Sequence, residues 1–338
     1  MDYKDKNRLM RLRETFNSNY RITQLYAAYL EHCPEIIKSD MVDELCSDGT
    51  LTKEDAIRAL VCEILGLDFE KDDDRKLIRD YVNPSIRVLD RNSYTSDSYF
   101  GQIKIENKIS GNWEFRHECY PAYRAVICDD LITLPDFTEI PPLGFFTEPF
   151  EFPAVLEDGN EWMTLTPVDM DTCHEAIAAA HGRVVTFGLG LGYYAFHAAK
   201  KPEVESVTVI ERSPEVIKLF CDEILPQIPW RDKINIIEYD AFEYAENIMP
   251  KENFDLAFVD IWRDGGDGAL AYKKIKPLEA LSENTKFLYW IEGFILSRLK
   301  ALRFEELWNP AQKGDITYDT LTRELTDKVA LANPRNEK

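Results

Sequence analysis

The sequence predicts an α/β protein built on a doubly wound, mostly parallel sheet, and three observations support this. Short apolar, β-branched runs recur at residues 184–187, 207–210, 234–237 and 256–259, separated by segments long enough to form helices. The first run ends in a glycine-rich turn, as strand-to-helix connections in such sheets often do. Acidic residues follow the other three runs, where the carboxyl ends of parallel strands face one crevice.

The glycine-rich turn contains Gly188, Gly190 and Gly192, and an apolar segment of helical length follows at residues 193–199. Backbone N–H groups at the start of a helix are free to bind a ligand. A dinucleotide-binding turn usually reads G-x-G-x-x-G, with Gly or Ala closing the pattern. Here the spacing is G-x-G-x-G, and Tyr193 stands at the closing position. The spacing therefore disfavours a dinucleotide-dependent dehydrogenase.

Three carboxylates at the ends of the predicted strands are candidate ligand contacts. Glu211 can accept hydrogen bonds from two ribose hydroxyls, and Asp240 can accept one from an adenine amine. Asp260 can act as a general base or anchor an acceptor; the alternative is that it only fixes the following loop or contacts the cofactor's amino group. Tyr193 and Trp262 are candidate aromatic walls that attract a cation, or else core residues.

These elements, in this order, resemble the class I S-adenosylmethionine-dependent methyltransferases, which have a Rossmann-like fold. The stretch VVTFGLGLG is similar to their first motif, VTVIE to the acidic ribose-binding motif, EYDAF to the adenine-side motif, and FDLAFVDIW to the strand before the catalytic loop. The resemblance covers roughly a third of the chain. Many members carry an acid two residues before the first glycine, where this chain has Thr186; spermidine-synthase-like members lack that acid too.

The resemblance implies a methyltransferase with S-adenosylmethionine as cofactor and a small molecule as acceptor. The strand-end acids and the net charge of −21 suggest a cationic amine as one such acceptor. It implies Asp260 as the catalytic residue, with Tyr193 and Trp262 at the acceptor. The implied cofactor contacts are Phe187, Gly188, Gly190, Gly192, Glu211, Arg212, Asp240, Ala241 and Asp260. Thr164 and Thr166 precede the first core strand, where they either donate to the cofactor's carboxylate or belong to an edge strand and a helix cap.

Two other functions stay open. An aminopropyltransferase of the spermidine synthase type shares the acid at Glu211 and the Asp-Ala pair, and often has an N-terminal β-hairpin domain. That family usually has an Asp where Leu191 stands and a second acidic motif where Arg263-Asp264-Gly265 stands. A noncatalytic nucleoside-binding or scaffold protein is the other alternative, because a fold does not imply a function. No metal site is expected, since Glu283-Asn284 precedes a predicted strand rather than following it.

Composition narrows the function classes further. The chain has 338 residues, 45% of them hydrophobic, and a formal net charge of −21, so a nucleic acid partner is disfavoured. Seven scattered cysteines without a C-x-x-C pair are typical of reduced thiols in a cytoplasmic protein. Neither a signal peptide nor an apolar run long enough to cross a membrane is recognisable. The sequence leaves the oligomeric state open.

The predicted organisation has three consecutive segments. These are a helical N-terminal module at 1–90, a β-hairpin segment with a proline-rich connector at 91–160, and a Rossmann-like S-adenosylmethionine-binding domain at 161–338. The sequence predicts helices over 5–32, 34–46, 53–65 and 68–81, the last opened by an acidic run. It also predicts a hairpin from 99–105 and 113–119, and an extended connector over 134–153.

Overall fold

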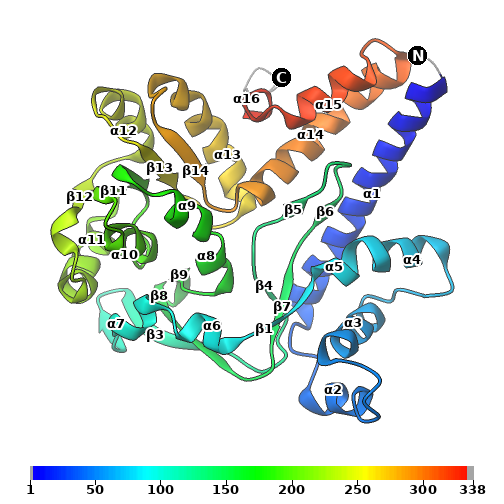
Figure 1. The fold of residues 1–338 in the computed structure, drawn as a ribbon, viewed down its shortest axis with the longest axis horizontal. Coiled ribbons are helices and arrows are strands. Elements are labelled where there is room, and N and C mark those ends of the chain that lie inside the picture. Colours follow the sequence, from blue (N-terminus) through cyan, green and yellow to red (C-terminus); the bar gives the residue numbers. More distant parts are fainter. Residues whose placement is uncertain (1–2, 333–338) are drawn as a thin grey trace. The chain divides into compact units, whose positions relative to one another are not determined.

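The computed structural model describes residues 3–332, and the chain divides into two compact units (Figure 1). We call them the helical unit and the sheet unit. The helical unit comprises Met1–Tyr94, Cys119–Glu151 and Lys300–Thr326, and the sheet unit comprises Thr95–Glu118, Phe152–Leu299 and Asp327–Lys338. Each unit is therefore assembled from three separated stretches of chain, which differs from the three consecutive segments that the sequence predicts.

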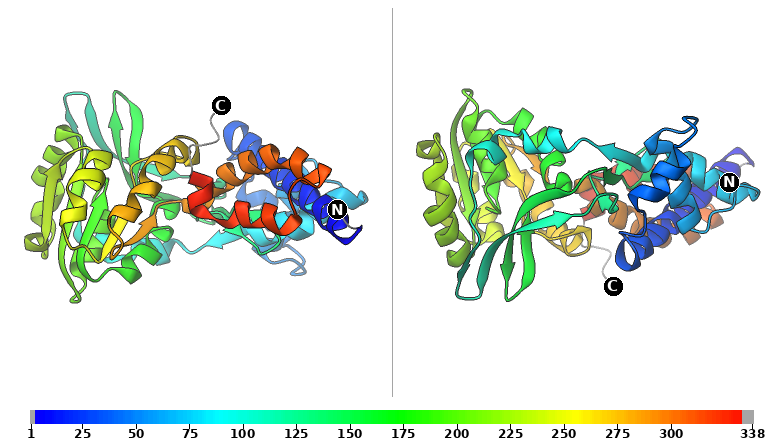
Figure 2. Two further views of the ribbon diagram at one scale, coloured as in Figure 1. Left: turned by 90° about the horizontal axis from the view of Figure 1, so that it is seen from above. Right: turned by 90° about the horizontal axis from the view of Figure 1, so that it is seen from below.

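The sheet unit is built on five parallel strands, which confirms the predicted Rossmann-like α/β fold (Figures 1 and 2). The strand order is β12-β11-β10-β13-β14. The first strand of this sheet, β10, is central; β11 and β12 follow on one side of it, and β13 and β14 then follow on the other side. Ligands in such sheets bind where this reversal opens a crevice at the carboxyl ends of the strands. The strands are β10 (Gly182–Phe187), β11 (Val204–Glu211), β12 (Ile234–Glu238), β13 (Leu256–Val259) and β14 (Lys286–Tyr289).

Helices connect successive strands of this sheet because parallel neighbours require a crossover. Their apolar faces pack on strands whose side chains are almost fully buried, such as Val207–Ile210 and Leu256–Val259. The connecting helices are α10 (Tyr193–Lys200), α11 (Pro214–Leu219), α12 (Ala241–Asn247) and α13 (Gly265–Ile275). Helix α14 (Glu292–Lys313) follows β14 and continues into the helical unit, whereas α16 (Lys328–Ala332) returns to the sheet unit.

A second sheet has the order β2-β3-β8-β9. The turn at residues 111–112 joins β2 and β3 as predicted, but the expected strand over 99–105 is wrong. That stretch contains helix α7, because Asp97 caps it by accepting the N–H of Tyr99 at 2.7 Å. The elements are α6 (Arg91–Thr95), α7 (Ser98–Gln102), β2 (Lys108–Ser110), β3 (Trp113–Tyr120), β8 (Phe150–Glu157), β9 (Asn160–Thr164), α8 (Pro167–Asp171) and α9 (His174–Ala179).

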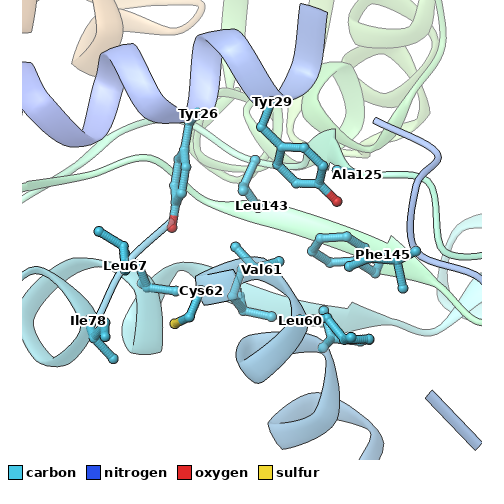
Figure 3. Close-up of a cluster of buried hydrophobic side chains, with 14 of the residues drawn as sticks. Tyr26, Tyr29, Leu60, Val61, Cys62, Leu67, Ile78, Ala125, Leu143 and Phe145 are labelled. Atoms are coloured by element: carbon cyan, nitrogen blue, oxygen red, sulfur yellow. The ribbon is translucent and has the colours of Figure 1, made fainter. Parts of the chain in front are cut away.

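In the helical unit, tyrosines of the first helix pack on a small sheet. Figure 3 shows Tyr26 and Tyr29 pointing from α1 into a buried cluster, with Leu143 between their rings and Phe145 below Tyr29; all four are buried. The predicted helices are present, with shorter bounds for the second and fourth. The elements are α1 (Tyr3–His32), α2 (Ser39–Leu45), α3 (Lys53–Ile64), α4 (Asp72–Leu77), a π-helical turn (Ile78–Val82), α5 (Asn83–Ser85), β1 (Ile86–Leu89), β4 (Val126–Ile127), β5 (Ile132–Thr133), β6 (Glu139–Ile140), β7 (Leu143–Phe146) and α15 (Tyr318–Thr326).

The prediction of an extended connector over 134–153 is wrong. This stretch contains β6, β7 and the start of β8, and every residue of β7 is buried. Strand β7 lies between β1 and β4; it pairs antiparallel with the nearby β4 and parallel with β1, which is distant in sequence. Pro141, Pro142 and Pro149 lie outside the strands, whereas Pro153 lies inside β8.

Candidate functional site

The glycine turn lies between β10 and α10, at the carboxyl edge of the parallel sheet. Gly188 and Gly192 adopt φ values of +95° and +75°, a region that side chains rarely enter. A Cβ on Gly188 would collide with the carbonyl oxygen of Asp260, which follows the neighbouring strand β13. A glycine is thus needed at 188 both for the conformation and to let the two strand ends approach.

Glu211 ends β11, directly beside the turn. Its Oε2 accepts the N–H of Leu189 at 3.2 Å, and its Oε1 accepts the N–H of Ser213 at 2.8 Å. Parallel pairing of Phe187 with Ile210 brings the ends of β10 and β11 together, so these short bonds form. The carboxylate is consequently held against the glycine turn, and the exposed Arg212 follows it.

Asp240 is the N-cap of α12. Its Oδ1 accepts the N–H groups of Phe242 at 2.9 Å and Glu243 at 3.0 Å. Its Oδ2 makes no hydrogen bond within residues 3–332 and remains available to a ligand. The side chain therefore combines a structural cap with one free acceptor beside Ala241, the first residue of the helix.

Asp260 directly follows β13, and its N–H donates to the carbonyl oxygen of Phe187 at 2.8 Å. Burial raises the pKa of the Asp260 carboxyl to about 8, and repulsion by Asp169 and Glu211 adds to this. The raised pKa favours the protonated form of this carboxyl near neutral pH. A perturbed acid at the end of a central strand is typical of a functional site.

All these strand ends border one cavity of about 350 Å³, a size common for small-molecule sites. Six acids line it: Glu161, Asp169, Glu211, Asp240, Asp260 and Asp267. The lining cations are Arg212 and Arg263. The excess of carboxylates favours a positively charged ligand, which agrees with the expectation from the net charge.

Most of the predicted site residues line this cavity: Gly188, Gly190, Tyr193, Glu211, Arg212, Asp240, Ala241, Asp260 and Trp262. Two others have a different role. The ring of Phe187 is fully buried and packs against Tyr244 in the sheet core, since it lies on the face of β10 that helix α12 covers. Gly192 abuts the ring of Phe220, so it serves helix packing.

The two predicted acceptor contacts are largely core residues. Trp262 is 6% exposed; its Nε1–H donates to the carbonyl oxygen of Trp290 at 3.2 Å. The hydroxyl of Tyr193 donates to Asp97 Oδ2 at 3.4 Å, and His197 Nε2 lies 3.0 Å from Asp97 Oδ1. Each ring therefore borders the cavity along one edge, and its hydrogen bond to a neighbouring residue fixes its position.

Asp169 is a cavity residue that the sequence did not reveal. It accepts the N–H and Oγ1–H of Thr166 at 2.8 and 2.7 Å and the hydroxyl of Thr164 at 3.4 Å. Burial nevertheless raises the pKa of Asp169 to about 6. The two threonines thus serve as partners of Asp169 and as a helix cap, the second of their predicted alternatives. The Thr-Pro-Val-Asp pattern signals a capped helix, but only tertiary packing places its acid in the cavity.

Residues 3–332 contain no group of three or more His, Cys, Asp and Glu side chains arranged to hold a metal ion. The helices of this part of the chain are also too short or too polar to span a membrane.

No protein-family model matches the chain, and no curated protein matches its sequence. Among solved structures, the chain is similar to precorrin 8W decarboxylase from Methanobacterium thermoautotrophicum, with 21% identity, a TM-score of 0.30, and 41% of this chain and 73% of that chain covered. It is also similar to spermidine synthase from Thermotoga maritima, with 16% identity, a TM-score of 0.32, and 59% and 64% covered. The matched part is thus slightly less than two thirds of that synthase.

Proposed function

We propose that this protein is an S-adenosylmethionine-dependent methyltransferase that acts on a small cationic amine. The observation that carries the proposal is the convergence of Glu211, Asp240 and Asp260 on the cavity beside the glycine turn. A bound nucleoside needs acceptors for its ribose hydroxyls, an acceptor for its base amine, and a backbone that approaches it closely. The carboxylates can provide the acceptors, and the glycine turn allows the close approach.

The residues fit the proposed cofactor. Glu211 accepts from the ribose hydroxyls, and the free Oδ2 of Asp240 accepts from the adenine amine. Gly190 leaves room for the ligand, because a Cβ there would meet no protein atom closer than Met163 Sδ at 3.7 Å. When bound, S-adenosylmethionine supplies an electrophilic methyl group on a positively charged sulfur.

Asp260 is the proposed base for the acceptor. A protonated amine must lose a proton before it can attack, and Asp260 can accept that proton in its carboxylate form. A bound sulfonium and ammonium add positive charge beside Asp260, which lowers its pKa and favours the carboxylate. Tyr193 and Trp262 exclude water and keep the acceptor aligned, which is a major part of catalysis in a displacement.

Calorimetry on the full chain tests the proposal with three ligands: S-adenosylmethionine, its demethylated product, and decarboxylated S-adenosylmethionine. We expect the first two to bind. Glu211→Ala should weaken their binding by about 1–3 kcal/mol through lost charge-assisted hydrogen bonds. Glu238→Ala is the matched control, since Glu238 pairs in register with Glu211 on the neighbouring strand but does not line the cavity. Equal effects of the two variants would refute the ribose assignment.

The same experiment separates the alternatives. The six lining acids also suit a polyamine, so an aminopropyltransferase is the second candidate. Preference for the decarboxylated ligand would favour aminopropyl transfer. No measurable binding of any of the three ligands would favour a noncatalytic protein.

A further inference from the structure

We propose that Arg263, stacked on Trp162, receives a carboxylate of the bound ligand. The inference rests on the proposed function and adds the chemical class of one ligand group. Two sources can bring this carboxylate into the cavity: the amino acid end of the cofactor, or an acceptor that carries a carboxylate together with its amine.

The first observation is the place of the guanidinium. Arg263 follows β13 and Trp162 belongs to β9, and both line the cavity. The Cζ of Arg263 lies 4.8 Å from the centre of the Trp162 ring. A guanidinium that stacks on an aromatic face keeps its N–H groups directed outward at its edge, where they match the two oxygens of a carboxylate.

The second observation is that this cation is unpaired in an acidic cavity. Within residues 3–332 the guanidinium of Arg263 makes no hydrogen bond and no ion pair, although six acids line the same cavity. Attraction alone would draw a long, flexible side chain onto one of them. Stacking on Trp162 holds it away, so its donors stay free for a ligand.

The third observation is that neighbouring groups of the protein hold both Arg263 and Trp162 in place. Trp162 packs edge-to-face on the buried Trp113, with ring centres 5.5 Å apart. The carboxylate of Asp267 accepts the N–H groups of Arg263 at 3.2 Å and Asp264 at 3.1 Å. Asp264 in turn caps α13. The carboxylates of Asp264 and Asp267 thus already accept backbone N–H groups, and the loop is preorganised for binding.

The test uses two ligand pairs that differ in a carboxylate: S-adenosylmethionine with its decarboxylated form, and ornithine with putrescine. Affinities are measured by calorimetry on the full chain, for wild type and for Arg263→Gln and Arg263→Lys. We expect Arg263→Gln to lose about 10- to 100-fold in affinity for the carboxylate-bearing member of one pair, and about twofold or less for the other member. Arg263→Lys should lose most of this too, because an ammonium cannot form the planar fork.

Arg212→Gln is the matched control, since Arg212 lines the same cavity without an aromatic partner in the described part of the chain. It should change the affinity ratio of each pair by about twofold or less, because long-range charge effects in a solvated cavity are screened. A selective loss in the nucleoside pair assigns the carboxylate to the cofactor, and one in the amine pair assigns it to the acceptor. If Arg263→Gln alters neither ratio, or if no carboxylate-bearing ligand binds the wild type, the inference is refuted. Should the nucleosides fail to bind, the proposed function fails, but the amine pair still decides this inference.

Discussion

Asp260 offers the sharpest test of the site, because its effect on stability and its effect on activity should have opposite signs. Its pKa is raised from 3.8 to about 8 in the folded chain. Between these values the folded state keeps a proton that the unfolded state has released. Stability therefore falls as the pH rises, by about 1.4 kcal/mol per pH unit, and levels off above pH 8. Asp260→Asn resembles the protonated acid and avoids this loss.

We expect the free energy of unfolding of Asp260→Asn to exceed that of the wild type by about 4 kcal/mol at pH 7. The gap should widen by about 2 kcal/mol between pH 6 and pH 8. Methyl transfer should be lost. A residue whose replacement stabilises the protein and abolishes its activity is a functional residue that the fold tolerates at a cost.

Urea unfolding followed by tryptophan fluorescence measures the difference in the free energy of unfolding between Asp260→Asn and the wild type. Asp260 lies in the sheet unit. Trp113, Trp162, Trp230, Trp262 and Trp290 lie in the sheet unit, and Trp308 in the helical unit. Asp315→Asn is the control, because Asp315 is exposed near the end of α14 and should show no such trend. Parallel pH profiles for wild type and Asp260→Asn, or a variant that is less stable throughout, would show that this carboxyl is not held protonated.

Three further predictions concern other parts of the structure. Gly188→Ala should destabilise the sheet unit by about 2–4 kcal/mol through backbone strain and overlap with Asp260, whereas Gly101→Ala, whose Cβ would meet nothing within 4 Å, should be nearly neutral in urea unfolding. Lys300→Met should cost the helical unit about 3–5 kcal/mol, because Lys300 Nζ lies 3.3 Å from the buried Glu139 carboxylate. The double variant with Glu139→Gln should regain part of this in circular dichroism, and no regain would argue against the ion pair. S-adenosylmethionine binding near pH 7 should release protons from Asp260, seen as buffer-dependent heats in calorimetry; uptake would contradict the expected charge of the ligand.

The core of the fold was predictable because its signals are local. The β-branched runs that become β10, β11 and β13 are buried on both faces, and the turn at Gly188 has a sequence signature of its own. Glu211 and Asp260 could be placed in one crevice because the ends of parallel strands meet at the same edge.

Other features depend on tertiary contacts that no local pattern contains. Strand β7 was not predicted, because its partner β1 lies more than fifty residues earlier in the chain. The side chain of Asp169 enters the cavity only because β9 and α8 lie beside the parallel sheet. The glycine-rich sequence around Arg263 is typical of a solvent-exposed loop. Only the tertiary structure shows that Arg263 contacts Trp162.

The discontinuous helical unit has a consequence for synthesis on the ribosome. The apolar stripe of α1, with Leu9, Leu12 and Phe16, is covered by Phe304, whose ring stacks on Phe16 with centres 4.0 Å apart. Almost three hundred residues separate Phe16 from Phe304, so at ordinary translation speeds roughly 15–60 seconds pass between the synthesis of the two. During that interval the nascent chain exposes an apolar surface that chaperones would bind. A chain truncated before Phe304 would leave these residues of α1 without the aromatic ring that covers them.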